Sequence, residues 1–177
     1  SCADINQHLA DWQDDGLVNN PNSNVYAFPC GGNSFFEQYN APLTLPSTAQ
    51  GSAGFFDRNQ NAIYEPQNGE YPSIQVRGCS EDAFPEEQNW FVFNDFTIHP
   101  SKMAPIGMEV QSQFFAYKTP TASILNNTVF ARYKLINRSN ERIDSCFLGV
   151  YADFDIGNPD DDFLGSIPDR NILYGYN

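Results

Sequence analysis

Residues 128–137, TVFARYKLIN, alternate regularly between two sets of side chains. One set would face one side of an extended chain and the second set the other: Val129, Ala131, Tyr133 and Leu135 against Phe130, Arg132, Lys134 and Ile136. A period of two is typical of a β-strand, because successive side chains point to opposite faces of a sheet. The stretch therefore predicts a strand.

Similar strand signals lie on both sides of this stretch. They are WFVF at 90–93, GMEVQSQFFAYK at 107–118 and IDSCFLGVYAD at 143–153, and the polar run NRSNE at 137–141 is a turn signal between two of the strands. Strands at such short spacing predict an antiparallel sheet packed on a second layer. We therefore expect a mainly β fold, specifically an antiparallel β-sandwich.

The N-terminal part has a different character. Residues 3–12, ADINQHLADW, place Ile5, Leu9 and Trp12 at helical spacing and predict one short helix. Residues 13–56 contain no Lys or Arg and are rich in polar residues, Gly and Pro, so low complexity is one interpretation. Five aromatic residues favour ordered loops instead: Tyr26, Phe28, Phe35, Phe36 and Tyr39.

The expected division is an irregular, loop-rich N-terminal lobe at 1–87, which holds the short helix and a calcium-type loop, followed by the sandwich at 88–177. The last residues, ILYGYN at 172–177, read as the middle of a strand. We therefore expect the sandwich to be a part of a longer polypeptide that continues beyond residue 177.

Composition excludes two classes of function. The chain has 22 Asp and Glu against 9 Lys and Arg, which gives a net charge of −13. A nucleic acid would be repelled, because its binders carry basic patches that replace counterions. No apolar run is long enough to span a bilayer.

The first candidate site lies in FFDRNQNAIYEPQNGEYP at 55–72. Oxygen-bearing side chains recur at Asp57, Asn59 and Asn61, the spacing at which calcium loops converge their ligands, and a backbone carbonyl would follow at Ile63. Glu65 or Glu70 would complete the shell. The alternative is an Asp/Asn turn whose side chains bond to their own backbone.

This loop departs from an EF-hand at three positions. Ala62 replaces the glycine of the sixth position, Asn68 stands where the twelfth would be Glu, and Pro66 would obstruct a following helix. We therefore expect the loop to lie between irregular elements.

The second candidate site is the acidic stretch YADFDIGNPDDDFLG at 151–165. Asp153 and Asp155 would share one face at a strand end, and carboxylates packed closely without a cation are costly unless their pKa rises. A divalent ion at Asp153, Asp155, Asn158 and Asp161 would remove that cost. A solvated acidic loop is the alternative, since repulsion in water is weak.

The four cysteines predict two disulfides, with Cys2–Cys30 and Cys79–Cys146 as the favoured pairs, and four buried thiols as the alternative. Disulfides would indicate an oxidising compartment. No zinc pattern, nucleophile elbow or phosphate loop is present in the sequence, so no catalytic residue is assigned.

The ordered series of segments LADW, FFDRNQNAIYEPQNGEYPSI, WFVFND, PIGMEVQSQFFAY, LNNTVFARYKLINRS and FLGVYADFDIGNPDDDFLG, followed by YGYN, carries a family resemblance. It resembles a segment common in large secreted and cell-surface proteins of Bacteroidetes that carry a C-terminal sorting domain of the type IX secretion system. Those proteins usually have Asp-x-Asn-x-Asn-Gly in the first loop and Asp-Asp-x-x-Gly-x-Asp in the second. Here Ala62 replaces the glycine of the first motif, and Ile167 replaces the last aspartate of the second.

The resemblance implies an extracellular or cell-surface location and a modular protein. We expect a calcium-stabilised structural or adhesion module without enzymatic activity, whose partners are other domains of the same polypeptide and surface glycans or other surface proteins. Part of a secreted polysaccharide- or protein-degrading enzyme is one alternative. A carbohydrate-binding module is another, with Trp90, Tyr151, Tyr174 and Tyr176 as candidate stacking residues.

Overall fold

The computed structural model describes residues 1–47, 51–74, 85–98, 102–158 and 160–177. The chain forms two compact units, Ser1–Asn140 and Glu141–Asn177, which are described separately below. The first unit contains both the irregular N-terminal elements and three strands of the predicted sandwich. The expected boundary at residue 87 therefore falls inside the first unit.

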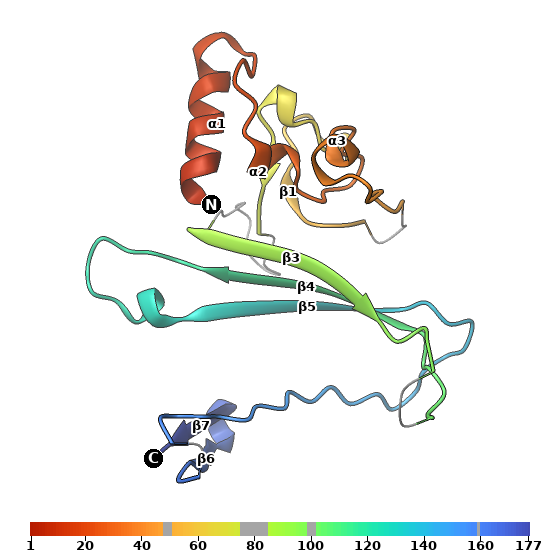
Figure 1. Ribbon diagram of the computed structural model, residues 1–177, viewed down its shortest axis with the longest axis vertical. Helices are drawn as coiled ribbons and strands as arrows, with labels where there is room; N and C mark the ends of the chain where they lie inside the picture. Colours follow the sequence, from red (N-terminus) through yellow and green to blue (C-terminus); the bar gives the residue numbers. More distant parts are fainter. Residues whose placement is uncertain (48–50, 75–84, 99–101, 159) are drawn as a thin grey trace. The chain divides into compact units, whose positions relative to one another are not determined.

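The central element of the first unit is a three-stranded antiparallel sheet in the order β3-β4-β5 (Figure 1). Its strands are β3 (Glu87–Asn94), β4 (Met108–Ala116) and β5 (Val129–Asn137). The strand predicted at 128–137 is β5, so this strand and its antiparallel pairing are confirmed. The fold is mainly antiparallel β with few helices.

The two faces of the sheet differ in chemistry, as the alternation predicts. On one face Phe91 stacks on Phe114 with ring centroids 5.6 Å apart, and Tyr133 meets Phe114 edge-on at 5.9 Å. Phe91 and Tyr133 remain exposed. The opposite face carries Trp90, Gln113 and Arg132 in one row across the three strands, and the stacked rings of Phe115 and Phe130 lie on the same face. Trp90 on this face packs against the N-terminal core.

The N-terminal helix α1 (Cys2–Asp15) confirms the predicted helix and extends it at both ends. Ser1 caps its first turn, and Gly16 ends it in the left-handed conformation, with φ 80°, a position at which glycine carries no steric cost. The helix buries Ile5 and His8.

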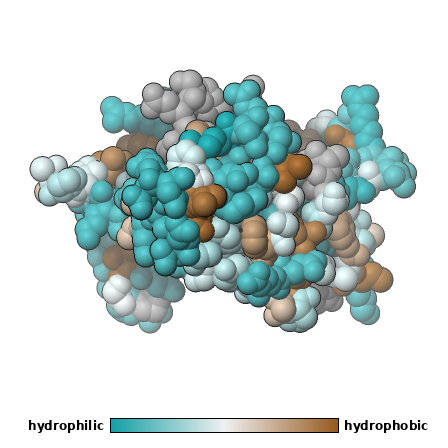
Figure 2. Space-filling view, turned by 90° about the horizontal axis from the view of Figure 1, so that it is seen from above, coloured by the Kyte–Doolittle hydropathy of each residue, from teal (hydrophilic) through white to brown (hydrophobic). Residues whose placement is uncertain are grey.

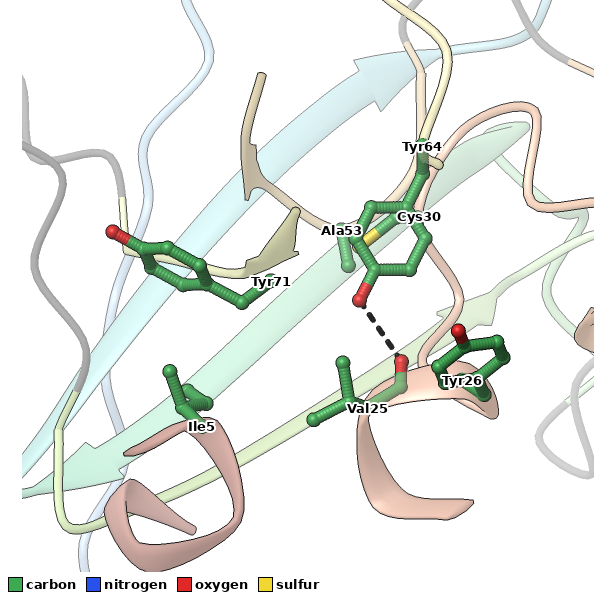
Figure 3. Packing of buried hydrophobic residues seen from close by; sticks show 7 residues of the cluster. All are labelled: Ile5, Val25, Tyr26, Cys30, Ala53, Tyr64 and Tyr71. Carbon is green, nitrogen blue, oxygen red and sulfur yellow. Dashed lines mark hydrogen bonds between the residues drawn. The ribbon is translucent and has the colours of Figure 1, made fainter. Parts of the chain in front are cut away.

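Short elements follow α1 and close around a core. They are α2 (Ser23–Tyr26), α3 (Phe36–Asn40), β1 (Phe55–Phe56), the 3-10 helix η1 (Pro66–Asn68) and β2 (Tyr71–Pro72). The core consists of Ile5, Val25, Tyr26, Cys30, Ala53, Tyr64 and Tyr71 (Figure 3). In Figure 3 the Tyr64 hydroxyl donates to the carbonyl of Val25 at 2.9 Å.

The predicted role of the aromatic residues is borne out in this core. Phe28, Phe35 and Tyr39 pack against the buried cluster, to which Tyr26 belongs, and Phe36 is also buried. Around the core, Figure 2 shows a face of the molecule that is mostly hydrophilic, with hydrophobic residues in isolated patches. The packing of these aromatic residues, rather than long helices or strands, therefore holds the loops at 13–47 in place.

The second unit holds one hairpin, β6 (Phe163–Ile167) and β7 (Ile172–Tyr176), joined by the 3-10 helix η3 (Pro168–Arg170). The strand expected at 143–153 is wrong, because this stretch has no strand partner and runs as irregular chain. Its apolar side chains stay exposed, Phe147 at 93% and Tyr151 at 87%. A strand requires a ladder partner for its backbone groups, and none of the described residues supplies one.

The cysteines also require a correction. Cys2, Cys30 and Cys146 are free thiols, so the expected Cys2–Cys30 bridge is not formed. The Cys30 side chain is enclosed in the core with Sγ 3.7 Å from the carbonyl of Gly54, whereas Cys2 accepts a hydrogen bond from Asn6 in the first turn of α1. The other expected pair involves Cys79, which lies outside the described residues.

Candidate functional site

The loop at 57–65 joins β1 to η1, and a buried carboxylate holds its two ends together. Glu70 is 0% exposed. Its two oxygens accept hydrogen bonds from the backbone N–H of Arg58 at 3.0 Å and of Glu65 at 2.8 Å. The loop is flanked by a strand and a 3-10 helix rather than by two α-helices.

Inside the loop, the Asp57 carboxylate organises the turn. One oxygen accepts from the backbone N–H of Asn61 at 3.2 Å and the other from that of Ala62 at 2.7 Å. The chain curls through left-handed conformations at Gln60 and Ala62, with φ 60° and 61°. Ala62 thus adopts, at the sixth position of the loop, the backbone conformation that favours glycine.

Three side chains converge beside this turn. The side-chain amides of Asn59 and Asn61 each donate to the same Glu65 oxygen at 2.8 Å. Their amide oxygens accept from the backbone: Asn59 from the N–H of Asn61 at 3.1 Å and Asn61 from that of Ile63 at 2.7 Å. These are the Asx turns that formed the alternative interpretation. Each amide oxygen keeps a second lone pair.

The loop also gathers negative charge. Burial, more than any other cause, raises the pKa of Glu70, and the charges of Asp57 and Glu65 raise it further. Hydrogen bonds from Asn59 and Asn61 lower the pKa of Glu65. Burial raises the pKa of the Cys30 thiol and the Tyr64 hydroxyl, and in both cases the charge of Glu70 adds to the shift.

The nearby cation is directed elsewhere. The Arg58 guanidinium lies 3.9 Å from the centre of the Trp12 ring and donates to the carbonyl of Gly69 at 3.3 Å. The ion pairs found among the described residues join Ser1 to Asp4, Arg138 to Glu109 and Arg142 to Asp144. None of them neutralises Asp57, Glu65 or Glu70.

Within the described residues, no three side chains of His, Cys, Asp or Glu lie close enough together to hold a metal ion by themselves. A shell at this loop would therefore be mixed. It would combine carboxylate oxygens of Asp57 and Glu65, amide oxygens of Asn59 and Asn61, and the carbonyl of Ile63. Glu70 belongs to the framework of the loop, because its oxygens accept backbone N–H groups and the residue is 0% exposed. The oxygens of Asp57 also accept backbone N–H groups, but this residue is only partly buried and lines the adjoining cleft.

The second acidic stretch has a different geometry. Asp153, Asp155, Asn158 and Asp161 are all exposed and lie in irregular chain. The carboxylate that organises this turn is Asp162, which the sequence did not single out: it accepts from the backbone N–H of Ile156 at 2.9 Å. In the described part of this stretch, no hydrogen bond joins the four predicted ligand side chains to one another.

A cleft of about 310 Å³ adjoins the first loop. Asp57 and Ala62 line it from the loop. The sheet lines it through a set of side chains that we call its polar face: Trp90, Gln111, Gln113, Arg132 and Lys134. Small residues, Gly51 to Gly54, complete the lining with Gly31 and Phe55. Asp57 is the one acidic residue among the described residues that line the cleft. These residues therefore do not supply the paired carboxylates that a glycosidase requires.

Sequence reasoning identified Trp90 as a candidate stacking residue but not the residues beside it. Trp90 is half-buried and also packs against the core. Gln111, Gln113, Arg132 and Lys134 occupy every second position on two neighbouring strands. Their alternation was visible in the sequence, but their position opposite the loop depends on how the sheet packs. The other stacking candidates, Tyr151, Tyr174 and Tyr176, belong to the second unit.

No family model, no characterised protein and no solved structure matches this chain. No helix in the described part is long and apolar enough to cross a membrane.

Proposed function

We propose that this chain is a calcium-stabilised structural or adhesion module of an extracellular or surface-attached bacterial protein. The observation that carries the proposal is the curled loop at 57–65, where the carboxylates of Asp57 and Glu65 lie among the amides of Asn59 and Asn61. Hydrogen bonds from Asn59 and Asn61 lower the pKa of Glu65, whereas the charge of Asp57 acts to raise it. The two carboxylates therefore repel each other, and a divalent ion would offset that repulsion.

The chemistry of the loop suits calcium better than a transition metal. Calcium takes six to eight oxygen ligands in flexible geometry, and carboxylate, amide and carbonyl oxygens alternate along residues 57–65. A transition metal such as zinc favours nitrogen and sulfur ligands. Among the described residues, the buried His8 bonds to the Glu70 carbonyl and Cys30 lies in the core.

We propose in addition that the protein is exported from the cell and that its sheet forms one layer of a β-sandwich. Export through the type IX secretion system is supported by the ordered sequence resemblance. A β-sandwich is supported by the exposed aromatic face of the sheet, since Phe91, Phe93 and Tyr133 would be buried beneath a second layer. Other domains of the same polypeptide and surface components are the proposed partners.

Thermal unfolding in calcium and in chelator tests the metal proposal. At a calcium concentration about a hundred times its dissociation constant, binding adds about 3 kcal/mol to the free energy of unfolding and raises the melting temperature by about 5–10 °C. Asp57→Asn keeps a side-chain oxygen that accepts a backbone N–H but removes one negative charge. This variant should therefore lose most of the calcium-dependent rise in melting temperature. Asp14→Asn, an exposed change on α1, is the matched control. Identical melting curves with and without calcium would contradict the proposal.

A further inference from the structure

We propose that the cleft between the first loop and the polar face of the sheet binds a uronate residue of an acidic polysaccharide. This proposal names a ligand class for the proposed adhesion module and rests on that function. The site is built from residues of β3, β4 and β5 facing Asp57 and Ala62.

The sheet register places three complementary groups in one line. Trp90 on β3 pairs with Gln113 on β4, which pairs with Arg132 on β5. Neighbouring strands are about 5 Å apart, so the row spans about 10 Å, the scale of one sugar ring with its substituents. An indole ring, an amide and a guanidinium would then meet the apolar face, a hydroxyl and the carboxylate of such a sugar.

Positive charge is concentrated on the polar face of the sheet. Arg132 and Lys134 are two of only 9 Lys and Arg in a chain with net charge −13. They stand two positions apart on β5 and so share a face. Burial lowers the pKa of Lys134, and the charges of Arg132 and Arg138 lower it further. Glu109, which acts in the opposite direction on Lys134, is itself paired with Arg138 at 2.9 Å.

The amides of the cleft are buried, and one acceptor has no partner. Gln111 and Gln113 are 6% and 2% exposed. The Gln111 amide donates to the carbonyl of Gly51 at 3.0 Å, and the Gln113 amide donates to the side chain of Gln88 at 3.1 Å. The Gln113 side-chain oxygen has no hydrogen-bond partner in the described structure. This oxygen is shielded from solvent, so it would meet a ligand hydroxyl only after the Gln113 side chain turns toward the cleft.

Other anions fit this polar face less well. A phosphate carries more charge, and Asp57 in the loop would repel it. Neither a phosphate nor the phosphate backbone of a nucleic acid uses the amides and the half-buried indole as fully as a sugar does. A uronate combines one carboxylate with several hydroxyls and an apolar ring face, which matches the groups available.

Calorimetric titration with trigalacturonate tests the proposal, with maltotriose and inorganic phosphate as comparison ligands. Wild-type chain should bind trigalacturonate and neither comparison ligand. Arg132→Gln and Lys134→Gln should each weaken binding about tenfold, because each removes a charge-assisted hydrogen bond. Arg142→Gln, whose side chain is 87% exposed in the second unit, is the matched control and should bind as the wild type does.

Each titration is run in calcium and in chelator, so that this proposal and the metal proposal fail separately. If Asp57→Asn still binds trigalacturonate but its melting temperature no longer depends on calcium, the cleft proposal is supported. The metal proposal is then decided by the melting curves alone. No binding of trigalacturonate in either condition would overturn the cleft proposal. Equal binding of phosphate or maltotriose would also overturn it, as would unchanged affinity in both β5 variants.

Discussion

Ala62 is an L-residue in the left-handed backbone conformation, with φ 61°, inside the candidate calcium loop. That conformation costs a residue with a Cβ about 1–2 kcal/mol, whereas glycine adopts it freely. Glycine also gives the unfolded chain more freedom, which offsets part of this gain. Ala62→Gly should therefore raise the free energy of unfolding by about 0.5–1 kcal/mol, measured by urea unfolding.

The same substitution in α1 provides the control for Ala62→Gly. Ala10 is exposed inside the helix, so Ala10→Gly should lower the free energy of unfolding by about 1 kcal/mol. If both variants lose stability equally, the loop at 57–65 does not hold Ala62 in the left-handed region.

His8 makes the stability of the first unit dependent on pH. It is 1% exposed, its Nε2 bonds to the carbonyl of Glu70 at 3.0 Å, and its Nδ1 has no partner within the described structure. Burial lowers the pKa of His8 from its ordinary value of 6.5. The folded state therefore holds His8 neutral, and the unfolded state takes up a proton first as the pH falls.

The sign of the pH effect follows from this order of protonation. The contribution of neutral His8 is complete above about pH 6.5 and is lost progressively as the pH falls toward the lower pKa of the folded state. Urea unfolding at a series of pH values should show this loss in the wild type and a flatter profile in His8→Gln. Equal slopes in the two proteins below pH 6.5 would contradict the assignment.

Among the secondary-structure elements, α1 and η1 are joined by a close contact between Trp12 and Gly69. Gly69 ends η1 with φ 77°, and a Cβ added there would lie 2.6 Å from the Trp12 ring. Gly69→Ala should therefore destabilise the chain by about 2 kcal/mol or more, from backbone strain and overpacking together. Thermal or urea unfolding measures the loss.

Gly31→Ala is the matched control for Gly69→Ala. A Cβ at Gly31 meets no atom within 4 Å, and its φ is not in the left-handed region, so its free energy of unfolding should change little. Similar losses in the two variants would show that the contact between Trp12 and Gly69 does not determine the packing of α1.

The strands show what sequence periodicity predicts well. The stretches at 90–93, 107–118 and 128–137 became β3, β4 and β5, because each finds a hydrogen-bonded neighbour on the chain. The stretch at 143–153 has comparable apolar content, yet it lacks such a partner in the described structure. Periodicity reports which face a side chain would take, whereas a strand also needs a ladder for its backbone.

The sequence predicted the position of the candidate loop but not the tertiary contacts around it. The spacing of Asp57, Asn59 and Asn61 located the loop, because local spacing determines a local turn. The role of Glu70 as a buried clamp and the cleft beside Arg132 arise from tertiary packing. No local pattern distinguishes a framework carboxylate from a ligand, or shows which loop a strand will face.

The division of the chain into two units predicts that the first unit folds independently of the second. Ser1–Asn140 contains the core cluster, the three-stranded sheet and the candidate loop. A chain ending at Asn140 should therefore fold cooperatively, with a calcium-dependent melting temperature close to that of the longer chain. A non-cooperative melting curve for this shorter chain would show that residues 141–177 are required for the first unit.

The central claim is that the loop around Asp57 binds a calcium ion, and calorimetric titration of calcium into the apo chain tests it most directly. The predicted result is saturable binding in the wild type that is retained in Asp14→Asn and lost in Asp57→Asn. The absence of saturable binding in the wild type, or binding of unchanged affinity and stoichiometry in Asp57→Asn, would contradict it.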